Sequence, residues 1–183
     1  MRQIRRLLLA TGMASLALLP SAVLASSLTE YVTGSEYAVG TCSLGQTGSF
    51  AGYGSATPGG RGNAIFATTI CHSPLGNTSG SIEPGGSFAL YLGSITLVGA
   101  YTGGSVGPGV VSPLFKGSTY FCKEAFPVTA LLGPATNVPA GATNITSTGS
   151  GATGTLTHIG VFTAGGGCYA LVATITGVAT LTY

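Results

Sequence analysis

The sequence predicts a single all-β domain. It has 31 glycines and 9 prolines in 183 residues, and it is rich in threonine, serine and valine. Threonine and valine favour strands, whereas glycine and proline favour the turns between them. Disorder requires low hydrophobicity and high charge, but here 45% of the residues are hydrophobic and 5% are charged. The length suits one domain with its own core.

Strands are expected where β-branched and aromatic residues run between turn clusters such as Pro58-Gly59-Gly60. Prolines at 127, 134 and 139 interrupt the one stretch with a helix-like alanine spacing. The predicted strands are, in order, 28–33, 36–44, 64–71, 87–101, 110–115, 118–122, 126–132, 144–148, 155–163 and 169–183.

The closing segment, 169–183, has the clearest strand pattern, because its apolar side chains alternate with threonines. The bulkier residues occupy the odd positions, and those assigned to an assembly strand are Tyr169, Leu171, Ala173, Ile175, Ala179, Leu181 and Tyr183. Such a strand is expected inside a sheet or against another subunit.

The N-terminus is typical of an export signal. Arginines among the first six residues precede an apolar run over 7–19, and Val23 and Ala25 supply the small residues that signal peptidase requires before Ser26. Residues 1–25 are therefore predicted to be removed. The mature chain keeps three Lys and Arg against four Glu, a net charge of about −1, which gives no support for a nucleic-acid partner.

The four cysteines indicate disulfides, because an even count in an exported chain favours pairing. Three pairings are possible. Cys42–Cys71 and Cys122–Cys168 are favoured, because each joins cysteines that lie near each other in sequence. A metal site is disfavoured because no C-x-x-C spacing occurs.

The sequence predicts no enzyme activity, cofactor or metal. The segment from Gly103 to Gly107 matches G-x-S-x-G, but the glycines and proline that follow forbid the helix that a nucleophile elbow needs. His72 and His158 have no acidic residue beside them and are expected in turns or on a sheet surface. With no Asp and four Glu, stability is expected to change little in acid.

Together, the exported β-domain, the alternating N-terminal segment before Cys42, the strand NAIFATTIC that ends at Cys71, and the closing ATLTY resemble chaperone–usher pilins and the related spore-coat-U-like subunits. The resemblance implies an immunoglobulin-like β-sandwich with an N-terminal donor-strand extension. It also implies a structural subunit of a secreted cell-surface fibre, or fimbria, that serves adhesion or biofilm formation. The implied partners are further copies of the chain, a periplasmic chaperone and an outer-membrane usher.

Carried onto this chain, the resemblance makes 26–41 the donor extension and 42–183 the sandwich domain, with Cys42 and Cys71 as the early disulfide. The predicted donor residues share one face of an extended segment: Thr29, Tyr31, Thr33, Ser35, Tyr37 and Val39. Segment 169–183 becomes the strand that the chaperone recognises.

Two other interpretations stay open. A small outer-membrane β-barrel also ends in an alternating strand with a terminal aromatic residue, although such barrels have polar interiors and rarely use disulfides. A hydrophobic surface-coat protein would explain the high apolar content.

Overall fold

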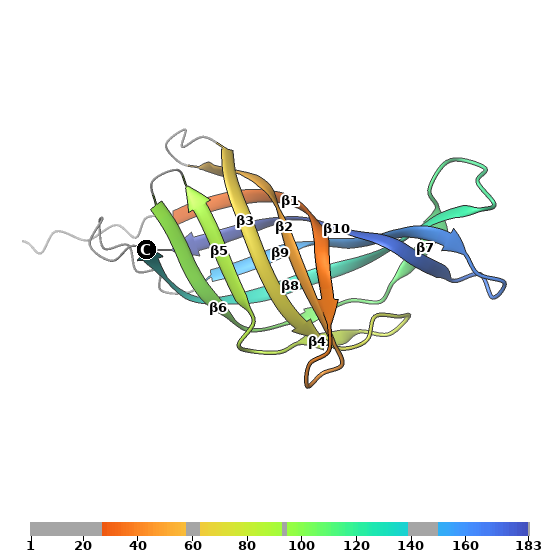
Figure 1. Cartoon of the computed structure of the whole chain (residues 1–183), viewed down its shortest axis with the longest axis horizontal. Coiled ribbons are helices and arrows are strands. Elements are labelled where there is room, and N and C mark those ends of the chain that lie inside the picture. Colours follow the sequence, from red (N-terminus) through yellow and green to blue (C-terminus); the bar gives the residue numbers. More distant parts are fainter. Residues whose placement is uncertain (1–26, 58–62, 93–94, 139–149, 183) are drawn as a thin grey trace, which may run out of the picture.

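The computed structural model describes residues 27–57, 63–92, 95–138 and 150–182 (Figure 1). The predicted signal peptide 1–25, the predicted strand 144–148 and Tyr183 lie outside these ranges. The described residues include no helix long and apolar enough to cross a membrane.

The described chain is built from ten strands, and the prediction of an all-β protein is confirmed. The strands are β1 (Ser27–Gly40), β2 (Gln46–Thr57), β3 (Asn63–His72), β4 (Gly80–Ile82), β5 (Ser87–Leu92), β6 (Ile95–Val106), β7 (Val110–Pro113), β8 (Phe121–Val138), β9 (Ser150–Phe162) and β10 (Cys168–Thr182).

These strands form one antiparallel sheet that closes on itself. Its order is β4-β6-β5-β3-β2-β1-β10-β9-β8-β7, and a further pairing of β6 with β8 closes a ring of all strands except β4 and β7. Each strand of this ring pairs with its neighbours in sequence, and β1 pairs with β10, so the ring is an up-and-down barrel. The prediction of a two-sheet immunoglobulin-like sandwich was therefore wrong, because alternation along single strands does not reveal whether a sheet closes.

The two ends of the barrel differ. The terminal end holds the start of β1 and the end of β10, and the mouth end holds segments 41–45, 73–86, 107–120 and 163–167. Both disulfides lie at the mouth end. In Figure 1, β8, β9 and β10 run out past the rest of the barrel on that side, where β7 pairs with β8.

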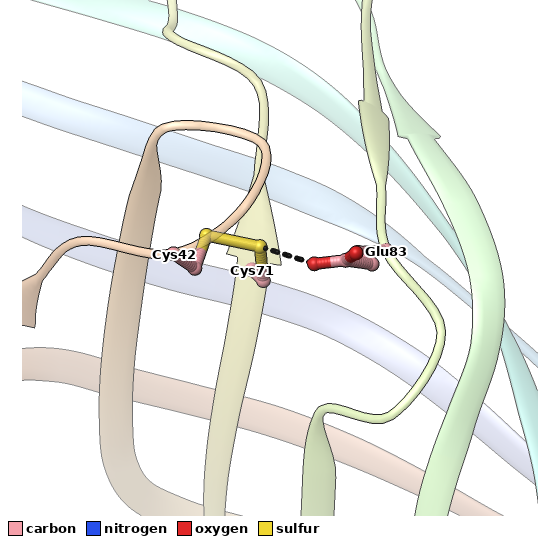
Figure 2. A group of neighbouring side chains, drawn as sticks. All are labelled: Cys42, Cys71 and Glu83. Carbon is pink, nitrogen blue, oxygen red and sulfur yellow. Dashed lines mark hydrogen bonds between the residues drawn. A yellow bond between two sulfur atoms is a disulfide. The ribbon is translucent and has the colours of Figure 1, made fainter.

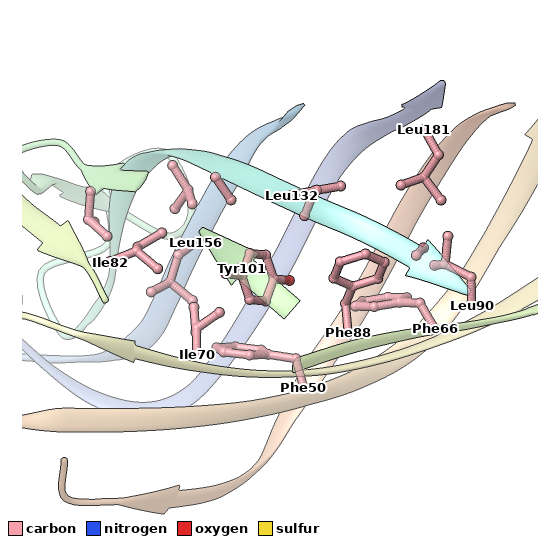
Figure 3. Packing of buried hydrophobic residues seen from close by; sticks show 14 of the residues in the cluster. Phe50, Phe66, Ile70, Ile82, Phe88, Leu90, Tyr101, Leu132, Leu156 and Leu181 are labelled. Atoms are coloured by element: carbon pink, nitrogen blue, oxygen red, sulfur yellow. The ribbon is translucent and has the colours of Figure 1, made fainter. Parts of the chain in front are cut away.

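The inside of the barrel is an apolar core. Aromatic rings from neighbouring strands fill it, including Phe50, Phe66 and Phe88 (Figure 3). Tyr101 packs edge-on against Phe88 with ring centroids 5.7 Å apart, and its hydroxyl shares a hydrogen bond of 2.5 Å with the hydroxyl of Thr68. The cavity that remains among these side chains measures about 70 Å³, far below the roughly 300–1,000 Å³ of typical ligand sites. The interior is therefore a packed core.

Glycines on the inner face make room for these rings. A Cβ atom at Gly34 would lie 2.6 Å from Cζ of Phe66, and one at Gly99 would lie 2.4 Å from Cζ of Phe88. Such distances are too short for any side chain, so the rings occupy the volume that the glycines leave free. This packing accounts for much of the glycine that the sequence places in strands.

The outer wall of the barrel is almost free of charge. Among charged residues on the described strands, Lys123 is exposed, whereas Glu30, Glu36 and Glu124 are buried or half-buried. The remaining outward positions carry mainly threonine, alanine, serine and tyrosine. The wall is thus polar through hydroxyl groups and not through ionic ones.

Several strand predictions need correction. The predicted strands 28–33 and 36–44 are one strand, β1, and 118–122 and 126–132 both fall within β8 or just before it. The predicted strand 87–101 is two strands, β5 and β6. Strand β2 was missed because its glycines and serines resemble a loop, and β9 begins at Ser150, before the predicted strand 155–163.

Candidate functional site

The candidate site is an opening in the barrel wall where β1 and β10 separate. Their ladder ends at the pair Ser35 and Thr174. Beyond it, β1 continues to Gly40 paired with β2, and β10 continues back to Cys168 paired with β9. Between the separated ends lies a cavity of about 540 Å³, lined by Glu36, Val39, His72, His158, Leu171 and Val172 among others.

A β-bulge in each strand produces this separation. In β1 the register against β2 shifts between Glu36 and Ala38, and in β10 the register against β9 shifts between Ala170 and Val172. A bulge adds a residue to one strand and bends it. Two bulges on facing strands therefore part them at the mouth end.

The two histidines of the chain meet at this cavity. His72 ends β3 and is 4% exposed, and its Nδ1 lies 2.8 Å from the carbonyl oxygen of Ser73. His158 lies on β9 with its ring edge-on to Phe126, with centroids 5.2 Å apart. Burial lowers the pKa of His158, and the nearby charge of His72 lowers it further. The expectation that both histidines occupy turns or the sheet surface was wrong for His72, which is buried.

Two carboxyl groups lie near the histidines. Glu36 lines the cavity from β1, and Glu124 faces His158 across the β8–β9 ladder. Burial raises the pKa of each of these carboxyl groups. Two histidines and two of the four glutamates thus lie at or near this cavity in a chain with few ionisable side chains.

A second cluster lies on the side of the mouth, around the first disulfide (Figure 2). Sγ of Cys71 lies 2.9 Å from Oε2 of Glu83, which also accepts a hydrogen bond from the hydroxyl of Ser43. Among the described residues, Cys42, Cys71 and Glu83 form the one group of three potential metal ligands whose ligand atoms all lie within 4.8 Å of one another. Both sulfurs are joined in the disulfide, so neither is a thiolate that binds a metal ion.

The favoured disulfide pairing is confirmed. Cys42 is bonded to Cys71 and Cys122 to Cys168. Both bonds tie strand ends together at the mouth end.

The predicted donor residues lie on β1, which is paired on both sides within its own barrel over Thr29–Ser35. Tyr31, Thr33 and Ser35 are exposed on the outer wall. The bulge interrupts the shared face, since Tyr37 is the extra residue and Val39 pairs with Gly48, an inward position. Up to Ser35, alternate residues of β1 thus share the outer face of the barrel.

The predicted face of β10 is divided in the same way. Ala173, Ile175, Ala179 and Leu181 point into the barrel and pack on its core. Leu171 is the extra residue of the bulge, and Tyr169 pairs with Val161 on the outer face. The bulge therefore exposes Tyr169 and Leu171 in place of burying them.

Sequence reasoning missed Glu30, the most deeply buried ionisable side chain among the described residues. It lies inside the terminal end of the barrel, 1% exposed, and neither of its carboxyl oxygens has a hydrogen-bond partner. Burial raises its pKa to about 7. The alternation along β1 could have indicated this burial, because Glu30 shares the inward face with Val32 and Gly34.

Comparisons of the chain with protein-family models, with curated proteins and with solved structures found no match.

Proposed function

We propose that the chain is a structural subunit of an extracellular assembly whose copies join at the mouth end of the barrel. The observation that carries the proposal is the open edge of β10. Residues Cys168–Ala173 pair with β9 on one side, and no described strand pairs with them on the other. An open edge presents unpaired N–H and C=O groups that another strand can take up.

The side chains beside this edge are apolar and exposed. Tyr169 is 64% exposed, Leu171 63% and Val172 50%. Across the opening, Tyr37 and Val39 of β1 are exposed as well. Aromatic and aliphatic side chains grouped at an exposed edge favour a protein partner.

The partner we propose is a second copy of the chain. Its own segment 168–173 would lie antiparallel to the first about a two-fold axis, so that each copy uses the same surface. The added strand would continue the line of the ladder that β1 already makes with β10. The segment contains no charged residue, so two copies approach without like-charge repulsion, and the uncharged outer walls favour lateral packing in the same way.

In this proposal the copies join by edge addition, in which segment 168–173 of one copy pairs with the same segment of another, and not by donor-strand exchange. Residues Thr29–Ser35 already pair with both β2 and β10, and donating them would break both ladders. Edge addition leaves the barrel intact. It also needs no chaperone or usher to fill a missing strand, so those two predicted partners are not part of the proposal.

The packed interior favours this proposal over a membrane-spanning barrel. Membrane barrels place apolar side chains outward and polar ones inward, whereas here the aromatic core lies inside and threonines line the outside. Strand β5 spans six residues, fewer than the roughly 9–11 of a tilted transmembrane strand.

The test is sedimentation velocity of the mature protein over a range of concentrations. Val172→Lys places a charge at the open edge and is expected to weaken self-association at least about tenfold, because edge lysines block strand pairing. Thr176→Lys is the matched control, since Thr176 is exposed on the same strand but pairs with Thr33. A wild-type chain that stays monomeric, or two variants with equal effect, would refute the proposal.

A further inference from the structure

The outer wall of the barrel becomes apolar where β8, β9 and β10 run out past the other strands (Figure 1). A row of paired residues crosses these strands, because Val161 on β9 pairs with Phe121 on β8 and with Tyr169 on β10. Residues directly opposite each other in adjacent strands place their side chains on the same face of the sheet. Phe121 and Tyr169 are exposed, so the projecting part of the wall presents large side chains to solvent.

A second row lies beside the first. Ile159 on β9 pairs with Lys123 on β8 and with Val172 on β10. Phe115, in the connection from β7 to β8, is 64% exposed and lines a shallow hollow of about 280 Å³ with Ile159 and Val172. We call this surface the tip face, and its members are Phe115, Phe121, Ile159, Tyr169, Leu171 and Val172.

Two lysines accompany the tip face. Lys116 follows Phe115 in the chain, and Lys123 lies two residues after Phe121 on the same side of β8. Among the residues that the structure describes, these lysines are the only charged ones whose side chains are exposed. The nearest glutamate in sequence, Glu124, is half-buried and points to the other side of β8. The tip face therefore combines apolar side chains with positive charge.

We propose that the tip face binds the surface of an anionic lipid bilayer. Aromatic side chains favour the layer between water and hydrocarbon, and aliphatic side chains gain free energy by leaving water there. Lysine ammonium groups are attracted to anionic headgroups, and their long side chains keep the charge at the headgroup level while apolar neighbours are buried. The barrel would lie on the bilayer by this face and would not span it.

The charges argue against a second copy of the chain as the partner of this face. Two copies would bring the same lysines together, and all four glutamates are buried or half-buried, so none is exposed to pair with them. A nucleic acid would supply negative charge and could stack on aromatic rings, but it would give no apolar environment to Ile159, Leu171 and Val172. An anionic bilayer supplies both negative charge and apolar surroundings.

Membrane binding leaves the backbone edge proposed for self-assembly free. Strand pairing at the edge of β10 uses N–H and C=O groups in the plane of the sheet, whereas the side chains of the tip face point out of that plane. One chain contains the whole face, so membrane binding does not depend on self-assembly. Sedimentation without lipid and binding to lipid therefore test the two proposals separately.

The experiment is co-sedimentation of the mature protein, at low salt and low protein concentration, with vesicles of equal parts phosphatidylglycerol and phosphatidylcholine. Vesicles of phosphatidylcholine alone should bind at least about tenfold more weakly, since each lysine contributes about fivefold on an anionic surface. Lys116→Gln and Lys123→Gln should each weaken binding to the anionic vesicles about fivefold. Added salt should weaken it as well, because it screens the lysines.

A fluorescent reporter locates the contact. The sequence has no tryptophan, so a single introduced tryptophan reports its own surroundings. Phe115→Trp should shift its emission to shorter wavelength on the anionic vesicles. Tyr53→Trp is the matched control, because Tyr53 is 73% exposed on β2, outside the tip face, and its emission should not change.

Thermal unfolding first confirms that each variant is folded. Absence of binding to the anionic vesicles, equal binding to both kinds of vesicle, or lysine variants that bind as wild type would overturn the proposal. Equal shifts in the two tryptophan variants would overturn it too. Binding to poly-L-glutamate but not to vesicles would identify an acidic polypeptide as the partner and would likewise refute binding to a bilayer.

Discussion

The two ends of the barrel place their buried ionisable groups in different surroundings. At the terminal end, Glu30 is enclosed by the core and its carboxyl oxygens have no partner. At the mouth end, Glu36, His72 and His158 line a cavity that opens between two separated strands. Burial shifts the pKa of Glu30, Glu36 and His158 towards the neutral form.

The difference lies in how completely the strands enclose each group. Glu30 is sealed by intact ladders on both sides of β1, so its ionisation costs stability and nothing offsets that cost. The mouth groups line a cavity between separated strands, and Glu36 and His158 are only half-buried there. Desolvation is therefore expected to have its larger effect on stability at the terminal end.

The largest expected effect comes from the disulfides, which occur at the mouth end alone. Replacing Cys122 and Cys168 by alanine opens a crosslink of sequence separation 46 and should lower the free energy of unfolding by about 4 kcal/mol. The Cys42–Cys71 crosslink has a separation of 29, and its loss should cost slightly less. Denaturant titration measures both. Reduced wild-type protein is the control and should lose as much as both pairs together.

The next largest effect is expected at Glu30. Its pKa is about 7 in the folded chain against 4.5 as a free side chain. Below pH 4.5 the Glu30 carboxyl group is protonated in both the folded and the unfolded chain. Between pH 4.5 and 7 it is ionised in the unfolded chain but still protonated in the folded one, so the free energy of unfolding falls as the pH rises. The loss reaches about 3 kcal/mol above pH 7. Glu30→Gln should therefore be more stable than wild type at pH 8 and equal to it at pH 4, as measured by thermal unfolding.

Glu36→Gln is the matched comparison at the mouth. Burial raises the pKa of Glu36 as well, but the group is half-exposed, so its variant should gain less at pH 8. His158 changes stability in the opposite direction. Because its pKa is lowered in the folded chain, the unfolded chain binds the proton more readily, and the free energy of unfolding falls as the pH drops below 6.5. Equal gains from both glutamine variants would show that the terminal end is not sealed as the structure implies. The sequence-based expectation of flat stability in acid thus changes to a rise from pH 8 towards pH 5.

The smallest of these effects concerns the wall itself. Gly34→Ala would place a Cβ 2.6 Å from both the carbonyl oxygen of Ala51 and the ring of Phe66, and overpacking of this kind typically costs about 1–3 kcal/mol. Gly76→Ala, in a mouth segment, meets no atom within 4 Å. It should change stability by less than about 1 kcal/mol. A similar loss in both variants would mean that glycine flexibility, and not ring packing, explains Gly34.

The sequence predicted those parts of the fold that depend on local pattern. The inward face of β10 from Ala173 to Leu181 follows from alternation, and the disulfide pairing follows from proximity along the chain. Bulges leave no signal of this kind, because one extra residue at Tyr37 or Leu171 looks like ordinary alternation. The opening in the wall, which depends on both bulges, was therefore not predictable.

Barrel closure and the histidine pair were beyond sequence reasoning for a different reason. Both depend on residues far apart in the chain that the fold brings together: Ser27 pairs with Thr182, and His72 and His158 line one cavity. Glycine was also misleading in β2. The inward Gly48, Gly52 and Gly54 suggested a loop, whereas in the barrel they lie on the crowded inner face.

The positions of the disulfides have a consequence for the order of folding. One crosslink ties Cys42 to Cys71 within the first three strands, and the other ties Cys122 to Cys168 within the last three barrel strands. Neither crosses the β1–β10 ladder or the β6–β8 ladder. The oxidised chain thus contains two crosslinked segments, and strands β4 to β7 between them belong to neither. The β1–β10 ladder joins residues from opposite ends of the chain and has the largest loop-closure cost. We expect it to form last, when the two crosslinked segments come together and the barrel becomes a closed ring.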